Sequence, residues 1–249
     1  MSGHSKWASI KHKKAVVDAR RGQHFTKLAR AITVAAKEGG GDPTGNPGLA
    51  LAIQKARDAS MPKDNIERAI QKGTGAGVDA ESFETVTYEG YGPGGVAILI
   101  EALTDNRNRT AADVRHIVAK GGGSLGEPGS VAYLFEKQGV IIVEAEKYSE
   151  DELIVAIDAG AQDIVLDDDV FEVITAPADF TVVRDALTQA GIEVESSDVT
   201  QRPKSRVQLE EEAATKLMKL IDALEDSDDI GAVYANYEVD ADLLERILG

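Results

Sequence analysis

The chain has 249 residues, of which 43 % are hydrophobic, and 27 Lys and Arg against 43 Asp and Glu give it a formal net charge of −16. This composition can fill real cores, and the length is typical of two or three domains. With no cysteine, the chain has no disulfides, thiolate metal sites or cysteine nucleophiles. Its apolar runs are too short to span a bilayer and its polar, basic N-terminus is unlike a signal peptide, so we expect a cytoplasmic protein without a membrane partner.

The charge is divided unevenly along the chain. Residues 1–80 hold 14 Lys or Arg against 7 Asp or Glu, a net of +7, whereas residues 81–249 hold 13 against 36, a net of −23. The first 37 residues contain nine cations and a single acid, Asp18. The total charge argues against a nucleic-acid partner, but its distribution indicates a cationic head on an anionic body.

The first 80 residues predict a basic arm and a small helical domain. Residues 1–22 carry few large apolar groups at core spacing, so we expect an arm that orders on a partner. Apolar residues then recur at helical spacing from Phe25 to Gly39 and over residues 49–56, and a third helix begins at Pro62 and ends at Gly73. A glycine-rich linker follows over residues 74–79.

Beyond residue 80 the pattern alternates between strands and helices. We expect strands at 85–91, 96–103 and 130–136, a helix at 109–120 and a turn at 137–139. The next segment follows the βαββαβ order of a ferredoxin-like unit, with strands at 140–146, 164–166, 170–175 and 192–199 and helices at 149–159 and 177–190. The chain then continues with a basic, proline-containing segment at 201–205 and a long helix at 209–225. It ends with a strand at 232–239 and a helix at 242–248.

These elements predict an α+β multidomain fold. A small helical domain, residues 1–80 with the arm, precedes two α/β sandwich domains. Residues 81–137 supply an incomplete sandwich that the helix and strand of residues 204–249 would complete. We therefore expect the ferredoxin-like domain, residues 138–203, to be inserted into a discontinuous middle domain.

The basic arm is the main candidate for a binding site. Its clustered cations would neutralise phosphates and release counterions, which gives affinity without sequence readout, and its tryptophan could stack on an unpaired base. A solvated charge run is the alternative, but it leaves the sign bias unexplained. We assign nucleic-acid contacts to His4, Lys6, Trp7, Lys11, His12, Lys13, Lys14, Arg20, Arg21 and Lys27.

A second candidate anion site lies at residues 104–110, where a buried strand meets the start of a helix. Arg107 and Arg109 stand there beside the free N–H groups of the helix, an arrangement that favours a phosphate contact. Capping by Asn108 or Thr110 would explain the polar residues without requiring either arginine. Both interpretations stay open. The glycine-rich residues 121–129 predict turns, or a mobile loop beside these arginines.

No constellation of residues predicts catalysis. The glycine-rich stretches lack the sequences of nucleotide-binding loops, the histidines lack zinc spacing, and no serine lies on a nucleophile elbow. The acidic clusters at 167–169 and 225–229 predict solvated turns, although a metal-dependent nucleic-acid enzyme is the alternative. We expect no cofactor, no metal, no small-molecule substrate and no enzymatic activity.

Motifs spread along the chain resemble the YebC/PmpR family, most specifically over residues 3–135. They are Gly3–Trp7, Ile10–Lys14, Phe25–Leu28, Gly39–Pro43, Met61–Ile66, Tyr88–Pro93, Thr104–Thr110 and Gly129–Phe135. The resemblance implies a helical N-terminal domain, two α/β domains and a non-enzymatic, cytoplasmic regulator of gene expression.

The resemblance implies two different partners. Bacterial members are usually named transcriptional regulators, which bind DNA. The mitochondrial relative, the translational activator of cytochrome c oxidase, points to a ribosome-associated translation factor that binds ribosomal RNA and assists elongation through stretches such as consecutive prolines. The residues themselves favour structured RNA, because the arm lacks a helix-turn-helix with base-reading side chains and the body is acidic. The choice between DNA and the ribosome stays open.

Overall fold

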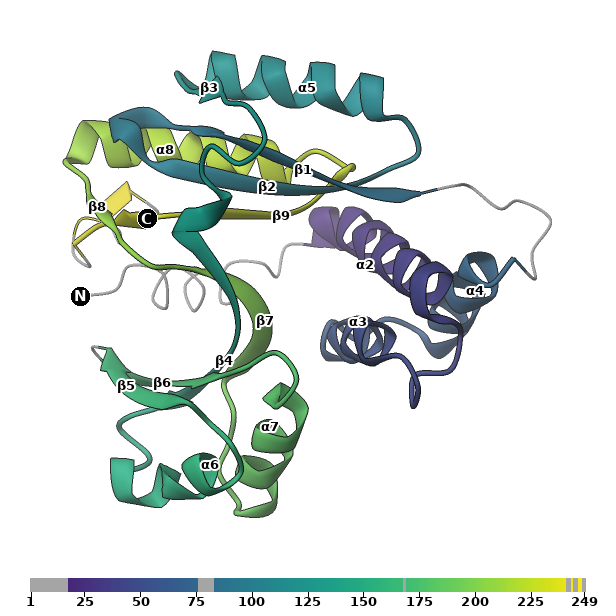
Figure 1. Cartoon of the computed structure of the whole chain (residues 1–249), viewed down its shortest axis with the longest axis vertical. Helices are drawn as coiled ribbons and strands as arrows, with labels where there is room; N and C mark the ends of the chain where they lie inside the picture. Colours follow the sequence, from purple (N-terminus) through teal and green to yellow (C-terminus); the bar gives the residue numbers. More distant parts are fainter. Residues whose placement is uncertain (1–17, 76–82, 168, 241–242, 244–245, 248–249) are drawn as a thin grey trace.

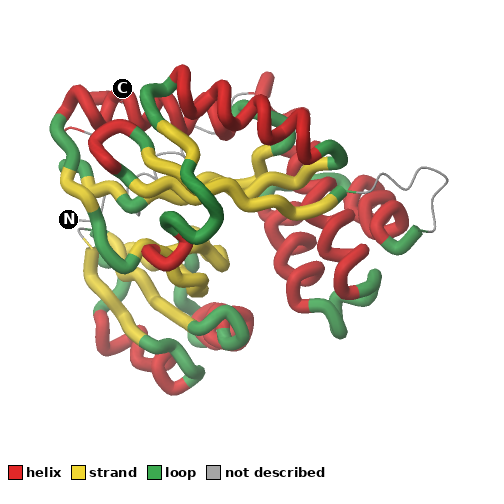
Figure 2. Tube along the Cα trace, turned by 45° about the horizontal axis from the view of Figure 1, so that its top comes forward, coloured by secondary structure: helices red, strands yellow, loops and turns green. Residues whose placement is uncertain are grey.

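The protein consists of a helical head and two α/β units (Figure 1). The computed structural model describes residues 18–75, 83–167, 169–240, 243, 246 and 247. The head contains α2 (Asp18–Gly39), α3 (Pro47–Asp58) and α4 (Lys63–Gly73), and Figure 2 shows its described part as helices and loops alone. The predicted α+β fold class is confirmed.

Helix α2 begins at Asp18, before the predicted start at Phe25. Alanine, arginine and glutamine, which follow Asp18, are good helix formers, and an acid at the first position complements the positive end of the helix. The prediction of an arm over residues 1–22 is therefore wrong for residues 18–22, which are helical. Residues 1–17 of the predicted arm lie outside the described residues.

One apolar core holds the head helices together. Ile32 of α2, Leu49 of α3 and Ile66 of α4 are buried in it, on the apolar stripes of their helices. Gly73 ends α4 against α2, where an added Cβ would lie 2.3 Å from the carbonyl oxygen of Thr33. The helix end therefore requires glycine for this close approach.

The first α/β unit is built on a four-stranded sheet in the order β3-β1-β2-β9. Its strands are β1 (Glu84–Tyr91), β2 (Ala97–Thr104), β3 (Ser124–Leu125) and β9 (Ile230–Ala235). Because β9 pairs with β2, the end of the chain completes this sheet, as predicted. Helices α5 (Arg107–Lys120) and α8 (Glu211–Glu225) cover one of its faces (Figure 1).

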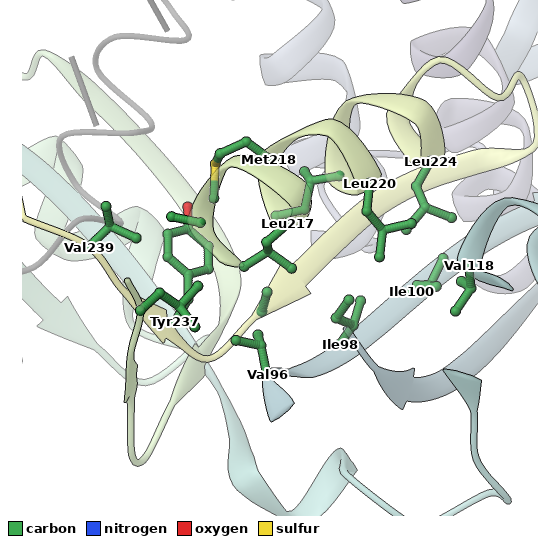
Figure 3. Packing of buried hydrophobic residues seen from close by; sticks show 14 of the residues in the cluster. Val96, Ile98, Ile100, Val118, Leu217, Met218, Leu220, Leu224, Tyr237 and Val239 are labelled. Atoms are coloured by element: carbon green, nitrogen blue, oxygen red, sulfur yellow. The ribbon is translucent and has the colours of Figure 1, made fainter. Parts of the chain in front are cut away.

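Strand β2 is apolar on both faces because it serves two cores. Ile98 and Ile100 point toward the helices and pack with residues that include Leu217 of α8 (Figure 3). Leu99 points to the opposite face and packs with Phe135. Side chains alternate across a strand, so a strand buried on both faces is continuously hydrophobic, as β2 is.

The second α/β unit has a ferredoxin-like sheet. Its antiparallel strands β4 (Phe135–Glu144), β5 (Asp163–Asp167), β6 (Val170–Thr175) and β7 (Ser196–Pro203) lie in the order β5-β6-β4-β7. The predicted βαββαβ order is confirmed by two helical segments between these strands. The first is the 3-10 turn η3 (Glu150–Leu153) with α6 (Ile154–Asp158), and the second is α7 (Phe180–Gln189). The unit lies between β3 and α8 in sequence, which confirms the predicted insertion.

Strand β4 corrects the prediction of a strand at 130–136 followed by a turn at 137–139. It runs without interruption from Phe135 to Glu144, and residues 132–134 form the 3-10 turn η2 (Ala132–Leu134) instead. Gly139, which the sequence assigns to the turn, lies in the middle of the strand. An added Cβ there would lie 2.2 Å from Thr175 Oγ1 and 2.6 Å from Phe180 Cδ2, so this glycine marks close packing.

The continuous strand β4 also belongs to both α/β units. Phe135 at its start packs in the core of the first unit, and Ile141 further along packs in the core of the second. The predicted boundary between residues 137 and 138 therefore falls inside a strand that both units share.

Other element boundaries also differ from the predictions. Strand β7 extends to Pro203 rather than Val199, because it pairs with the whole first part of β4. Helix α7 begins at Phe180 rather than Pro177. The predicted strand at 232–239 breaks at Asn236, whose side chain accepts a hydrogen bond of 2.7 Å from the backbone N–H of Ala97.

After this break, β10 (Tyr237–Glu238) pairs with β8 (Val207–Gln208) in a separate small sheet. Most of the predicted last helix lies outside the described residues. Within the described ranges, no helix combines the length and the apolar character needed to cross a membrane.

Gly139→Ala should destabilise the protein, because the new methyl group would overlap Thr175 and Phe180. Overpacking of this kind costs about 1–3 kcal/mol, which urea denaturation would show as a lower midpoint. Gly22→Ala in α2 is the control, since beyond its own helical turn no atom of the described residues lies within 4 Å of a Cβ at that position, and its midpoint should be equal or higher. Equal midpoints for Gly139→Ala and the wild type would contradict this account.

Candidate nucleic-acid interface

The structure describes three of the predicted nucleic-acid contacts in full. Lys27 lies on α2, and Arg107 and Arg109 lie on the first turn of α5. Arg20 and Arg21 lie near the start of α2. The remaining predicted contacts lie outside the described residues: His4, Lys6, Trp7, Lys11, His12, Lys13 and Lys14.

Lys27 takes part in an internal interface between the head and the first α/β unit. Its Nζ donates to the carbonyl oxygen of Glu225, the last residue of α8. Arg30, one turn later on α2, donates to the carbonyl oxygen of Asp228 at 2.6 Å and to Asp229 Oδ1 at 2.8 Å. The C-terminal end of a helix carries partial negative charge, so α8 attracts these two cations. Part of the head's positive charge is thus used to dock the head.

Asp229 joins three elements through one carboxylate. Besides Arg30 of α2, it accepts hydrogen bonds through Oδ2 from Arg109 at 2.9 Å and from the Thr110 hydroxyl at 2.7 Å. The Thr110 hydroxyl also lies 2.7 Å from the hydroxyl of Thr104 at the end of β2. Because Asp229 is only 7 % exposed, these donors replace the water that the carboxylate loses on folding.

The environment of Asp229 favours its charged form. Desolvation alone would raise the pKa of its carboxyl group, but the hydrogen bonds from Thr110, Arg109 and Arg30 and the positive charge of Arg109 outweigh it, so the pKa lies below its usual value of 3.8. The same contact, with help from Asp105, raises the pKa of Arg109. The group is therefore an ion-pair network with matched partners.

The predicted anion site at the start of α5 holds a carboxylate of the protein itself. Arg109 pairs with Asp229 and, at 2.7 Å, with Asp105, so its guanidinium is already engaged. The helix is capped by Asn106, whose side chain accepts from the backbone N–H of Arg109 at 3.1 Å, and not by Asn108 or Thr110, the residues of the capping alternative. Arg107 is the more exposed arginine, with its side chain 65 % accessible and 3.6 Å from Glu84.

An open groove of about 370 Å³ runs along this junction. Its lining is more acidic than basic, since four aspartates accompany two arginines; the lining residues are Arg30, Phe83, Asp105, Arg109, Asp113, Ser227, Asp228 and Asp229. Such a surface repels phosphate rather than attracting it.

Phe83 anchors the head at the point where the chain enters the first α/β unit, a role that the sequence did not predict. Its ring is buried, with the Arg30 guanidinium 5.1 Å and the Lys72 ammonium 5.8 Å from the centroid. Lys37 Nζ donates to its carbonyl oxygen at 3.3 Å. Both cations over Phe83 come from helices of the head, so no pattern in the residues around Phe83 could have revealed these contacts.

The head also contacts the ferredoxin-like unit. Lys55 of α3 pairs with Asp198 of β7 at 2.5 Å, and Leu51 packs against the apolar core of that unit. The head is therefore held by both α/β units.

The other predicted features lie far from these contacts. The glycine-rich residues 121–129 follow the C-terminal end of α5, so the prediction that they form a loop beside Arg107 and Arg109 is wrong.

In the 167–169 cluster, Asp167 is buried at the end of β5 and Asp169 is exposed. Among the described residues, no group of three or more His, Cys, Asp or Glu side chains could hold a metal ion.

Asp229→Asn should destabilise the protein, because Arg30 and Arg109 would lose the carboxylate that pairs them. The expected loss is about 1–3 kcal/mol in free energy of unfolding at pH 7. Since the folded pKa is lowered, the wild-type carboxylate contributes stability above about pH 4 and loses it as the pH falls through the folded pKa.

Urea denaturation from pH 7 to pH 3 would check this expectation: the gap between wild type and Asp229→Asn should narrow below about pH 4. Asp228→Asn is the matched control, because Asp228 is exposed and holds Arg30 through its backbone carbonyl. A loss as large in Asp228→Asn would show that the carboxylate network is not the cause.

The chain matches known proteins over nearly its whole length. Residues 5–76 match the TACO1/YebC protein N-terminal domain, and residues 83–237 match the TACO1/YebC second and third domain. Proteins named probable transcriptional regulatory protein from Rubrobacter xylanophilus and Acidothermus cellulolyticus are 54 % and 56 % identical, over 100 % and 99 % of this chain and 100 % of each relative. The crystal structure of a conserved hypothetical protein from Aquifex aeolicus superposes with a TM-score of 0.82 at 49 % identity, covering 94 % of this chain and 97 % of that one. The chain therefore belongs to the TACO1/YebC family.

Proposed function

We propose that this protein is a non-enzymatic regulator of gene expression that binds nucleic acid through the cations of its N-terminal segment. The observation that carries the proposal is the charge separation: nine cations against one acid in residues 1–37, ahead of a body with a net charge of −23. A strongly acidic body as a whole repels phosphate, so we expect most of the attraction to come from the basic end.

The ion pairs of the body support this division. More than half of the Lys and Arg residues after residue 80 lie within ion-pair distance of a carboxylate: Arg107, Arg109, Lys147, Arg184, Arg202, Lys216 and Arg246. Paired cations add little net potential. Lys27, Arg30 and Lys37 bond to residues at the junction of the head with the first α/β unit, which leaves Lys6, Lys11, Lys13, Lys14, Arg20 and Arg21 as the proposed phosphate contacts.

The names of the relatives support DNA as the partner, in the role of a transcriptional regulator. The exposed face of α4 carries charges of both signs, with Lys63 3.4 Å from Glu67, and so offers no basic helix for the major groove. Binding to DNA would then rest on phosphate contacts from the basic segment, with little base readout.

A translation factor bound to ribosomal RNA is the second candidate. The acidic groove at the head junction and the acidic body favour it, because a narrow basic segment can enter a folded RNA while the body stays outside. Crosslinking the protein in cells and sequencing the bound nucleic acid separates the two candidates. Ribosomal RNA would favour translation, and discrete promoter DNA would favour transcription.

The absence of catalysis is part of the proposal and has its own test. An enzyme using the acidic cluster at 167–169 would turn over nucleic acid with Mg²⁺ and lose that activity on Asp→Asn substitution there. Mg²⁺-dependent cleavage that followed this pattern would overturn the proposal.

Neutralising Lys11, Lys13 and Lys14 together with glutamine should weaken binding to all nucleic-acid sequences alike. The slope of log K against log salt should become shallower by about 2–3, since each lost phosphate contact removes about 0.7–0.9. Fluorescence anisotropy titrations at several salt concentrations measure both effects. Lys216→Gln with Lys219→Gln on α8 is the control and should leave the slope unchanged; a loss confined to one sequence would indicate base readout instead.

A further inference from the structure

Two motifs far apart in sequence meet at the edge of the first sheet. Glu89 on β1 is buried, and its carboxylate accepts hydrogen bonds from the backbone N–H groups of Gly129 at 2.6 Å, Val131 at 2.7 Å and Ala132 at 2.7 Å. Desolvation would raise the pKa of Glu89, but these three donors outweigh it and lower the pKa. Glu89 therefore fixes the loop in the manner of a buried anion held by backbone donors.

Further contacts hold the same loop in place. The Tyr91 hydroxyl donates to the carbonyl oxygen of Ser130 at 3.2 Å, and the Gly126 N–H donates to the carbonyl oxygen of Glu89 at 2.8 Å. Val131 is fully buried beneath the sheet. The segment that leads into β4 is thus a rigid support.

This support displays Tyr133. The side chain is 63 % exposed, more than any other large hydrophobic residue among the described residues, while Val131 before it and Phe135 after it are buried. An exposed aromatic ring adds little to stability, but on a rigid backbone it is a ready surface for stacking.

The backbone of one cationic residue, Lys204, lies beside the loop that carries Tyr133. The backbone N–H of Lys204 donates to the carbonyl oxygen of Leu134 at 2.8 Å, which places residues 204–206 beside η2. Lys204 and Lys137 are exposed, and neither forms an ion pair with any described residue. Glu136, the nearest acid along the chain, lies opposite Arg202 in the β4–β7 pair, and Arg202 forms its ion pair with Glu172. The patch therefore combines an aromatic ring with unneutralised cations on an otherwise acidic body.

We infer that Tyr133 and Lys204 form a second nucleic-acid contact, at which an unpaired base stacks on Tyr133 and its phosphate meets Lys204. Aromatic side chains accept any base whose face is free, and nearby cations hold the backbone, so the site selects single strands over duplexes. The inference rests on the proposed function, but it uses a different surface from the basic N-terminal segment.

Anisotropy titrations of the full chain with a labelled 12-residue oligouridine RNA and a blunt RNA duplex of equal length test the site. Tyr133→Ala should weaken binding of the single strand by about 5- to 100-fold and leave the duplex affinity unchanged. Tyr133→Phe should retain single-strand binding, because its ring can still stack. Lys204→Gln should make the salt dependence of single-strand binding shallower by about 0.7. Leu166→Ala, at another exposed apolar side chain (60 % exposed), is the control and should bind as the wild type does.

The outcomes separate this site from the proposed function. If Tyr133→Ala binds the single strand like the wild type while neutralising Lys11, Lys13 and Lys14 abolishes binding, the stacking site is wrong and the proposed function stands. An equal loss for single strand and duplex would also overturn the stacking site. If the wild type binds neither RNA nor DNA, both proposals fail. Unchanged urea midpoints in the Tyr133 variants would show that the fold is intact.

Discussion

The position of the head depends on the carboxylate of Asp229, which is buried where α2, α5 and the loop after α8 meet. A buried carboxylate is tolerated only when donors surround it, and here Arg30, Arg109 and Thr110 supply them from two different helices. The donors cannot move away without leaving an unpaired charge, so the network fixes where the head lies on the first α/β unit. The neighbouring contact of Lys27 with the end of α8 acts in the same direction.

The net charge of a segment overstates the charge it can offer to a partner. Lys27 and Arg30 count toward the +7 of residues 1–80, yet both are bonded to the acidic body. Arg109 stands at a helix start suited to phosphate, yet Asp229 takes that position. Among the nine cations of residues 1–37, those that remain for a nucleic acid are the most N-terminal ones, a set that is smaller and more localised than the composition suggests.

The sequence predicted the features that depend on local pattern, and missed those that depend on partners far along the chain. Helical periodicity identified the stripes of α2 and α3, and the element order identified the ferredoxin-like unit and its insertion. Gly139 was misassigned because glycine serves turns and close packing alike, and only the approach of Phe180 distinguishes them. The roles of Phe83, Asp229 and Glu89 were missed for the same reason: each is defined by donors or cations from other elements.

The paired strands that join the two α/β units have a consequence for modularity. The chain enters the ferredoxin-like unit on β4 and leaves it on β7, and these strands are hydrogen-bonded neighbours from Phe135 opposite Pro203 onward. The entry and exit points of the whole lobe are therefore adjacent, as they are at the base of a hairpin. Removing the unit as one piece and joining β4 directly to β7 by a short turn would therefore leave the first sheet continuous.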